Sequence, residues 1–339
     1  MKDLLFIDAD DIARALSPSA AADAVADVLR AGLDPETCPP RANVPVPAGE
    51  LLLMPAAAGA YAGVKIAGVA PANPGRGLPR ITGGYLLLEG ATLMPVALLD
   101  GAALTSLRTP AVSAVAIRHL AEPDAGHLVL FGAGPQAYGH LEAALAERPL
   151  TRLTVVSRTA SAAEALVAHA RTAFGLDART GTPDEVSGAD LVVCCTTARE
   201  PLFDGRLVPE HATVVAVGSH EPDARETDTA LVSRSRVFVE ARSVALREAG
   251  DLIIPVREGA LEPGRIVGTL ADLVSGRTAP GPGGPRFFKS VGMAWQDLAV
   301  AAAVHRAVER RGRGCVEREN ARRVPTKEGP EHDRPSTQP

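Results

Sequence analysis

The sequence predicts an α/β protein with two domains, one built on a parallel sheet and the other on a mainly antiparallel sheet. Between residues 33 and 115, short apolar runs are separated by proline and glycine, as in antiparallel sheets with short connections. From residue 127 onward, buried strand-like runs alternate with helix-like stretches, which is typical of a parallel sheet covered by helices on both faces. The 339 residues suffice for two such domains.

The antiparallel domain is expected to begin with helical segments within residues 10–31. Ser17 and Pro18 are typical of an N-cap and a first helical position, so they divide this stretch into two helices. Another helix is expected to start near Thr105, and a long alanine-rich helix is expected in KSVGMAWQDLAVAAAVHRAVERR. We assign residues 1–117 and 288–310 to this domain.

The parallel domain is assigned to residues 118–287. Its strands are predicted in HLVLF, LTVVS, LVVCC, TVVAVG and RVFVE, with helices at 135–148 and 160–174. ALREAGDLIIPVREGAL and TLADLVSG are interpreted as helices that cap the domain. Many charges of both signs and few apolar residues predict a disordered tail over 311–339.

Composition excludes several functional classes. A net charge of −5 argues against a surface that binds nucleic acid. No apolar run reaches the roughly 18 residues of a membrane span, and the N-terminal stretch is acidic where a signal peptide is apolar, so we expect a cytoplasmic protein. The four cysteines form no CxxC pair and are expected to be reduced: Cys38, Cys194, Cys195 and Cys315. No HExxH motif or histidine cluster is present, so no metal site is expected.

The turn between the first strand and helix of the parallel domain carries a GxGxxA motif. In it, Gly132 permits the tight turn, Gly134 lets a pyrophosphate approach the backbone, and the small Ala137 lets helix and strand pack closely. Pro135 and Gln136 open the helix, whose N-terminal amides favour an anion. The motif between a strand and a helix predicts a Rossmann dinucleotide-binding domain, with a glycine-rich turn without ligand as the alternative.

The end of the next strand indicates which dinucleotide binds. An NAD enzyme usually places an acidic residue there for the ribose hydroxyls, whereas this chain has Ser157, Arg158 and Thr159. A hydroxyl and a guanidinium attract a 2′-phosphate, so NADP(H) is favoured over NAD(H). The alternative is that Arg158 is a solvated surface charge.

Three cationic residues of the first domain are candidates for binding a small anionic substrate. Arg41 precedes a predicted strand, Lys65 interrupts an apolar strand, and Arg108 is expected in the first turn of a helix, where it opposes the macrodipole. Each alone is compatible with a structural ion pair. Together they predict a carboxylate clamp, because arginine binds a carboxylate bidentately and lysine adds a point charge.

The chain resembles the ornithine cyclodeaminase/μ-crystallin family. The matching stretches follow the family's order over about residues 10–310: VKIAGVAPANPGRGLPRITGGYLLLEGATLMPVALLDGAALTSLRTPAVSAVA, LVLFGAGPQAYGHLEAAL, VVAVGSHEPDARETD and FFKSVGMAWQDLAVAAAV. The resemblance implies a Rossmann domain and an α/β domain whose sheet pairs with that of a second subunit in a homodimer. It also implies use of NAD(P)(H) on small α-amino or α-imino acids.

The resemblance further implies roles for individual residues. Arg41, Lys65 and Arg108 fall on the residues that bind the substrate carboxylate in this family. Residues near the nicotinamide are expected in two other segments: Ser290, Val291 and Gly292, and Thr196 and Thr197.

One position departs from the pattern of true ornithine cyclodeaminases. They carry an aspartate for the substrate amine where this chain has His220, in GSHEPDARE. Histidine gives a weaker, pH-dependent contact, which places the chain closer to the μ-crystallin-like branch of ketimine reductases. His220 is a candidate second proton carrier, with a solvated loop histidine as the alternative. Asp297, in the last helix, is interpreted as a surface or capping residue outside the chemistry.

The resulting hypothesis is an NADPH-dependent reductase of a small α-imino acid, either a cyclic ketimine carboxylate or an imine formed from a keto acid and an amine. Arg41 and Arg108 would hold the carboxylate, and Lys65 would stabilise charge or donate a proton. Alternatives within the family are a cyclodeaminase, an amino-acid dehydrogenase or an N-(carboxyalkyl) amino acid synthase. An alternative of another class is a non-catalytic, crystallin-like protein that binds NADP(H), although such a protein needs no carboxylate clamp.

Overall fold

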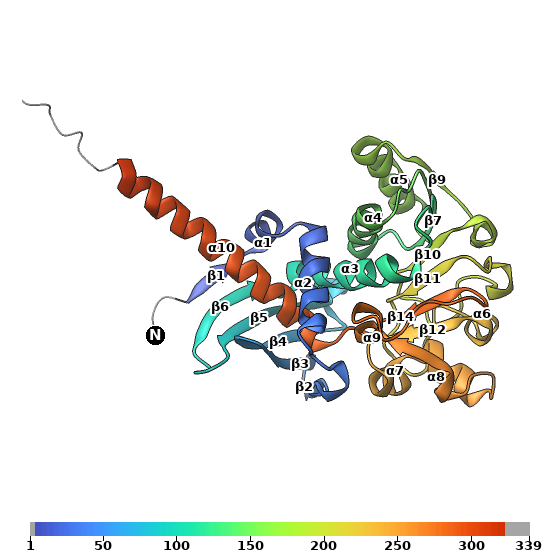
Figure 1. Ribbon diagram of the computed structural model, residues 1–339, viewed down its shortest axis with the longest axis horizontal. Coiled ribbons are helices and arrows are strands. Elements are labelled where there is room, and N and C mark those ends of the chain that lie inside the picture. The colour runs from blue at the N-terminus through green and yellow to red at the C-terminus, as the bar shows by residue number, and fades with distance from the viewer. Residues whose placement is uncertain (1–3, 323–339) are drawn as a thin grey trace, which may run out of the picture.

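The computed structural model describes residues 4–322 and the side chains of residues 4–311. Two sheets lie at opposite ends of the molecule, and helix α3 (Gly101–Leu120) lies between them (Figure 1). The expected α/β class, with one mainly antiparallel and one parallel sheet, is confirmed.

The first sheet has six strands in the order β1-β6-β5-β4-β3-β2. Strands β2 to β6 pair antiparallel, and β1, which the sequence did not predict, pairs parallel with β6. The strand bounds are β1 Leu5–Ile7, β2 Ala42–Val46, β3 Gly49–Ala58, β4 Tyr61–Val69, β5 Ile81–Glu89 and β6 Pro95–Asp100.

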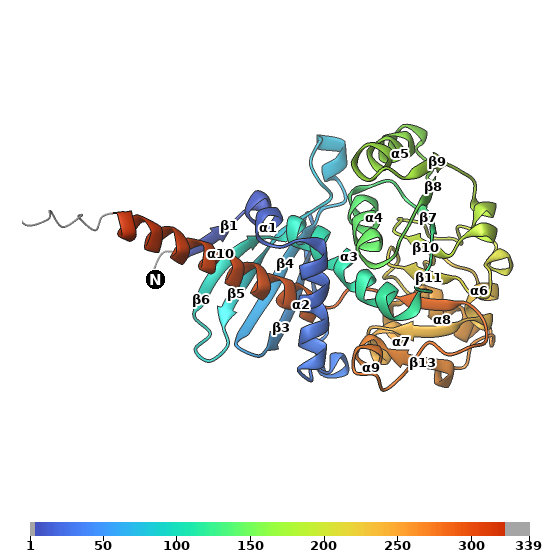
Figure 2. The same ribbon diagram turned by 45° about the horizontal axis from the view of Figure 1, so that its top comes forward.

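Helices cover one face of this sheet: α10 packs against β3, β4 and β5, and α2 packs against α10 and α3 (Figure 2). The bounds are α1 Ala9–Ala15, α2 Pro18–Arg30 and α10 Ala294–Arg322. Ser17 caps α2, as expected. Asp100 caps α3 by accepting hydrogen bonds from the amides of Ala102 and Ala103, so this helix begins at Gly101 and not near Thr105.

The second sheet has eight parallel strands in the order β13-β12-β14-β11-β10-β7-β8-β9. Three strands were missing from the prediction, namely β9, β13 and β14. The bounds are β7 His127–Phe131, β8 Arg152–Val156, β9 Asp177–Thr180, β10 Leu191–Cys194, β11 Thr213–Ala216, β12 Arg236–Val239, β13 Ile266–Thr269 and β14 Arg286–Lys289. The strand order reverses between β7 and β10, and such a reversal marks the ligand site in doubly wound sheets.

Six α-helices accompany the second sheet, and short 3₁₀ turns link several elements of the chain. The α-helices are α4 Pro135–Glu147, α5 Ala160–Phe174, α6 Thr229–Arg234, α7 Arg242–Glu248, α8 Gly250–Arg257 and α9 Leu270–Val274. The 3₁₀ turns are η1 Pro35–Thr37, η2 Asn73–Arg76, η3 Pro183–Gly188, η4 Gly205–Leu207 and η5 Pro263–Arg265.

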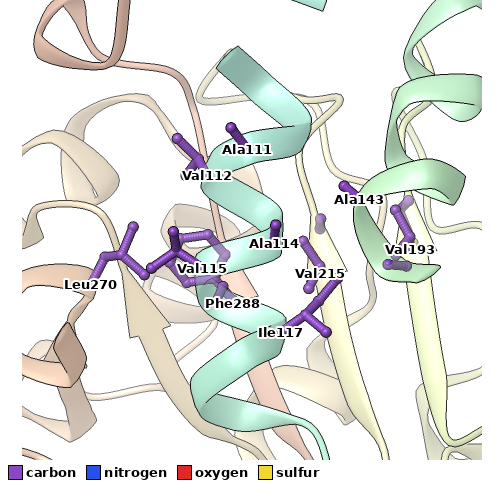
Figure 3. Close-up of a cluster of buried hydrophobic side chains, with 14 of the residues drawn as sticks. Ala111, Val112, Ala114, Val115, Ile117, Ala143, Val193, Val215, Leu270 and Phe288 are labelled. Atoms are coloured by element: carbon purple, nitrogen blue, oxygen red, sulfur yellow. The ribbon is translucent and has the colours of Figure 1, made fainter. Parts of the chain in front are cut away.

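Helix α3 belongs to the cores of both halves. Figure 3 shows its buried residues Val115 and Ile117 beside Val215 and Phe288 of the second sheet. The same helix packs against β5 of the first sheet. The expected domain boundary at 117/118 falls inside α3 and that at 287/288 inside β14.

The last helix and the C-terminal tail differ in part from what the sequence predicts. The long last helix was expected from Lys289 onward. It begins at Ala294, because Lys289 is the last residue of strand β14. Residues 311–322 continue this helix, so a disordered tail from 311 is wrong for them, and 323–339 lie outside the described residues. Cys38, Cys194 and Cys195 are free thiols, and the Cys315 side chain lies outside the described ones.

Two chemical features are absent from the part of the chain that the structure describes. None of its helices is both long and apolar enough to cross a bilayer. The same residues contain no cluster of histidine, cysteine and acidic side chains suited to a metal ion.

The two glycines of the turn after β7 differ in whether a side chain could be accommodated there. Gly132 has a φ of +111°, and a Cβ there would lie 2.8 Å from the carbonyl oxygen of Cys195. Gly134 has a φ of −88°, and its Cβ would meet no atom within 4 Å. The fold therefore requires a glycine at 132 but not at 134.

This contrast predicts different stabilities for two alanine variants. Gly132→Ala is expected to lower the free energy of unfolding by about 1–3 kcal/mol, because the backbone conformation and the close oxygen both oppose a Cβ. Gly134→Ala is expected to change it by less than about 1 kcal/mol. Urea denaturation of both variants measures the difference, and equal losses would contradict it.

Candidate active site

The turn with the GxGxxA motif follows the carboxyl end of β7 and lies beside the end of β10. The amide of Gly132 donates to the carbonyl of Val156, which ties the turn to β8. Helix α4 then begins at Pro135 with Gly134 as its N-cap and no side chain capping its amides. Ala137 is fully buried beneath the turn. An uncapped helix N-terminus beside an open backbone suits the pyrophosphate of a dinucleotide.

The residues expected at the adenosine ribose lie at the end of β8. Ser157 Oγ accepts a hydrogen bond from the amide of Thr159, and Arg158 is exposed. The Arg158 guanidinium lies 3.5 Å from Thr197 Oγ1, at the end of the neighbouring β10. The structure therefore brings the two predicted cofactor segments, 157–159 and 196–197, side by side.

A buried carboxylate orders the loops at the ends of β10 and β11. Glu226 accepts hydrogen bonds from the amide and hydroxyl of Thr196, each at 2.8 Å, and from the amide of Gly218 at 2.7 Å. Its backbone amide donates to Asp251, which pairs with Lys289 at 2.8 Å in the core. Burial raises the pKa of Glu226. These contacts fix the strand ends between the glycine turn and the first domain.

Two cations of the first domain meet at one carboxylate oxygen. Lys65 on β4 and Arg108 on α3 contact Asp297 Oδ1, Lys65 through Nζ at 3.3 Å and Arg108 through Nε at 3.2 Å. Lys65 also donates to Thr105 Oγ1 of α3. Met54 and Tyr85 lie opposite Lys65 on the neighbouring strands, and all three side chains face inward and are buried.

The interpretation of Asp297 as a surface or capping residue is therefore wrong. Its side chain is fully buried on α10, where Oδ1 binds both cations and Oδ2 has no partner within the described residues. The macrodipole argument for Arg108 is also wrong, because α3 begins at Gly101 and Arg108 lies beyond its first turn. The charge of Arg108 is explained by its buried carboxylate partner.

Burial and charge shift the acidity of Lys65. Its removal from water lowers the pKa of Lys65 to about 8, Asp297 counters this effect, and the positive charge of Arg108 adds to it. An ammonium with this pKa is mostly protonated at neutral pH and gives up its proton more readily than an exposed lysine. This behaviour suits a proton donor.

Arg41 reaches the same region from the loop before β2. It donates to the carbonyls of Val291, at 3.1 Å, and Gly292, at 2.7 Å, and pairs with Glu248 of α7 at 2.9 Å. Arg41, Met54 and Gly292 line one small cavity between the two halves. Each of the three predicted cations thus has a carboxylate partner, and Arg41 and Arg108 both lie against Gly292.

Gly292 lies where the two arginines approach each other. Its φ is +77°, and a Cβ there would lie 2.8 Å from Arg108 Nη1. Ser290 and Val291 precede it in the connection from β14 to α10, and both are buried. The structure brings this predicted nicotinamide segment into contact with the predicted carboxylate clamp.

His220 lies apart from the buried cations. Its side chain is exposed in the loop after β11, and no hydrogen bond joins its ring to Lys65, Arg41 or Arg108. Desolvation by the atoms around the ring and the positive charge of Arg41 lower the pKa of His220. The geometry leaves its role as a second proton carrier a prediction.

Sequence reasoning missed several residues that organise this site. They are Asp297, Gln296, Glu240 and Glu248. Asp297 carried a usable signal, because an acidic residue within the apolar run around WQDLAV is as costly to bury as Lys65 in its strand. Glu240 and Glu248 had none, because both end short elements where a carboxylate is commonly exposed.

Comparisons with known proteins agree with this arrangement. The model of the ornithine cyclodeaminase/mu-crystallin family matches residues 6–312. A Δ1-pyrroline-2-carboxylate reductase of Bacillus cereus is 36% identical over 257 residues, which are 74% of this chain and 79% of the relative. A Δ1-pyrroline-2-carboxylate reductase 1 of Burkholderia multivorans is 38% identical over 282 residues, which are 80% of this chain and 86% of the relative.

A solved structure extends the similarity to the whole fold. The Δ1-pyrroline-2-carboxylate reductase of Thermococcus litoralis, in complex with NADH and L-proline, superposes with a TM-score of 0.85 and 29% identity. The match covers 91% of this chain and 98% of that one. The chain therefore belongs to the ornithine cyclodeaminase/μ-crystallin family.

Proposed function

We propose that the chain is an NADPH-dependent reductase of a small α-imino acid, with a cyclic ketimine carboxylate such as Δ1-pyrroline-2-carboxylate as the first substrate to test. One observation carries the proposal: Lys65 and Arg108 are buried together at Asp297, beside the 290–292 segment that Arg41 also contacts. The names of the relatives support the same reaction class.

Each cation has a distinct task in this reaction. A bound nicotinamide cofactor would supply the hydride that the imine carbon takes up, and the imine nitrogen must gain a proton to give the amino acid product. Arg41 and Arg108 hold the substrate carboxylate, which fixes the imine carbon relative to the cofactor. Lys65 stabilises charge at the nitrogen or donates its proton, and Asp297 keeps Lys65 and Arg108 oriented.

A screen of NADPH oxidation tests the function. We expect turnover with cyclic imino carboxylates or with keto acids supplied with amines, and slower turnover with NADH as the control. Ammonia release from a diamino acid without net use of NADPH would instead identify a cyclodeaminase. Binding of NADPH without turnover of any imine would identify a non-catalytic binding protein.

The pKa of Lys65, at about 8, predicts the alkaline limit of activity. The ammonium is present below this pH and is lost as the pH rises through it, so kcat/KM is expected to fall above about pH 8. Asp297→Asn removes a negative charge that raises this pKa, so the fall is expected at lower pH. Measuring kcat/KM against pH checks both statements.

The control for this experiment is Asp184→Asn, which removes an exposed acid from η3. Its pH profile is expected to match the original protein. An unchanged alkaline limb in Asp297→Asn would show that the titrating group is not Lys65.

The preference for NADP(H) rests on Ser157, Arg158 and Thr159. Arg158→Ala is expected to raise the KM for NADPH about tenfold and leave the KM for NADH unchanged, because only NADPH carries the phosphate that a guanidinium binds. Steady-state kinetics with both cofactors measure this. Arg206→Ala, at an exposed arginine paired with Asp204, is the control. Equal effects on both cofactors would contradict the preference.

The outer face of the six-stranded sheet supports a homodimer. Residues that alternate with the buried ones form an apolar row across it: Phe6, Leu98, Leu86 and Val64, with Ile66 in the next row. Phe6 is 61% exposed and Ile66 43% exposed, although both are large and apolar. A contiguous apolar surface of this kind is typical of a subunit interface.

Ile66→Asp tests this interface. A carboxylate beside the apolar row is expected to convert the dimer to a monomer, because its desolvation opposes association. Light scattering coupled to size-exclusion chromatography measures the mass. Phe174→Asp, at an exposed aromatic residue on α5, is the matched control and should leave the dimer intact. A monomeric original protein would refute the proposed assembly.

A further inference from the structure

Glu240, directly after strand β12, is a buried carboxylate that accepts four hydrogen bonds. Oε1 accepts from Ser290 Oγ, at 2.6 Å, and from Gln296 Nε2. Oε2 accepts from the amides of Val291, at 3.0 Å, and Gly292, at 3.1 Å. The Glu240 side chain thereby binds both the connection from β14 to α10 and the first turn of α10.

All four partners of Glu240 are neutral donors. Within the described residues, no lysine or arginine forms an ion pair with this carboxylate, although it is 2% exposed. An ionised carboxylate only accepts hydrogen bonds, so it satisfies all four donors at once. Because Glu240 forms no ion pair, its role is sought in the groups that its four donors contact in turn.

The backbone amides among these donors connect Glu240 to Arg41. Val291 and Gly292 give their amides to Glu240, and their carbonyls accept the guanidinium of Arg41. The peptide groups of this short segment are thus held between one carboxylate and one guanidinium. Displacing the segment would move Arg41 with it.

The side chain of Gln296 connects Glu240 to Arg108. Gln296 donates through Nε2 to Glu240 and accepts at Oε1 from Arg108 Nη1, at 2.7 Å. The carboxylate fixes the orientation of the amide, because only its NH₂ group can face Glu240. The amide oxygen then faces Arg108.

We propose that Glu240 is a positioning residue that sets the two arginines of the carboxylate clamp relative to each other. It acts on Arg41 through the 291–292 backbone and on Arg108 through Gln296. The inference rests on the proposed function in that Arg41 and Arg108 hold the substrate carboxylate. It adds that the spacing of the two guanidinium groups is determined from the end of β12, in the other half of the molecule.

Glu240→Gln tests this role with almost no change in shape. The amide group replaces one acceptor oxygen by a donor, so two of the four donors face another donor whichever way the amide turns. The probe is pyrrole-2-carboxylate, a planar ring carboxylate that cannot accept a hydride. Its Kd for the NADPH-loaded protein, measured by calorimetry, is expected to rise at least about tenfold, since small displacements of a binding group are costly.

A second variant tests the connection from Glu240 to Arg108 separately from the connection to Arg41. Gln296→Met removes only the link to Arg108, so a smaller rise in the same Kd is expected, and the double variant should be no worse than Glu240→Gln. This pair also keeps the test valid if Glu240→Gln does not fold, which thermal denaturation reveals. Asp184→Asn, which changes an exposed acid of η3, is the control, and its Kd for pyrrole-2-carboxylate should stay within about twofold of the original value.

The outcomes separate this inference from the proposed function. An unchanged Kd for pyrrole-2-carboxylate in folded Glu240→Gln or Gln296→Met overturns the positioning role. Tight binding of the probe by a protein that reduces no imine overturns the function and leaves the positioning role supported by the variants. If the original protein binds no carboxylate at all, both proposals fail.

Discussion

The site depends on one carboxylate oxygen that two buried cations share. Lys65 and Arg108 are both removed from water, which is unfavourable unless each finds an anionic partner. Asp297 supplies that partner from α10, so a strand, a central helix and the last helix are fixed against each other at one point. Loss of this carboxylate would leave two uncompensated charges in the interior. The same pairing holds an ammonium beside an arginine, as imine reduction on a carboxylate substrate requires.

The two halves of the molecule contribute different parts of the chemistry. The parallel sheet presents its glycine turn and the Thr196 loop at the strand ends, where a dinucleotide binds. The antiparallel sheet presents Lys65 on its inner face. Helix α3, which carries Arg108, and the connection from β14 to α10, which accepts hydrogen bonds from Arg41, join the halves. The proposed cofactor and substrate sites are therefore held by shared elements and not by two independent domains.

Local patterns in the sequence predicted the parts of the site that depend on local geometry. The turn at Gly132 and the cations Arg41, Lys65 and Arg108 stood out from their neighbours, and the family resemblance is confirmed by the family model and the relatives. Partners distant in the chain could not be predicted, because spacing along one chain does not reveal which side chains meet. Asp297 and Glu240 were missed for this reason, and strands such as β13 were too short for a periodic signal.

The alternation of side chains along β4 has an evolutionary consequence. Lys65 points inward between Val64 and Ile66, which point to the outer face. A single inserted or deleted residue before this point would exchange the two faces, expose the ammonium and bury an isoleucine in its place. Insertions and deletions in β4 before Lys65 are thus expected to be removed by selection.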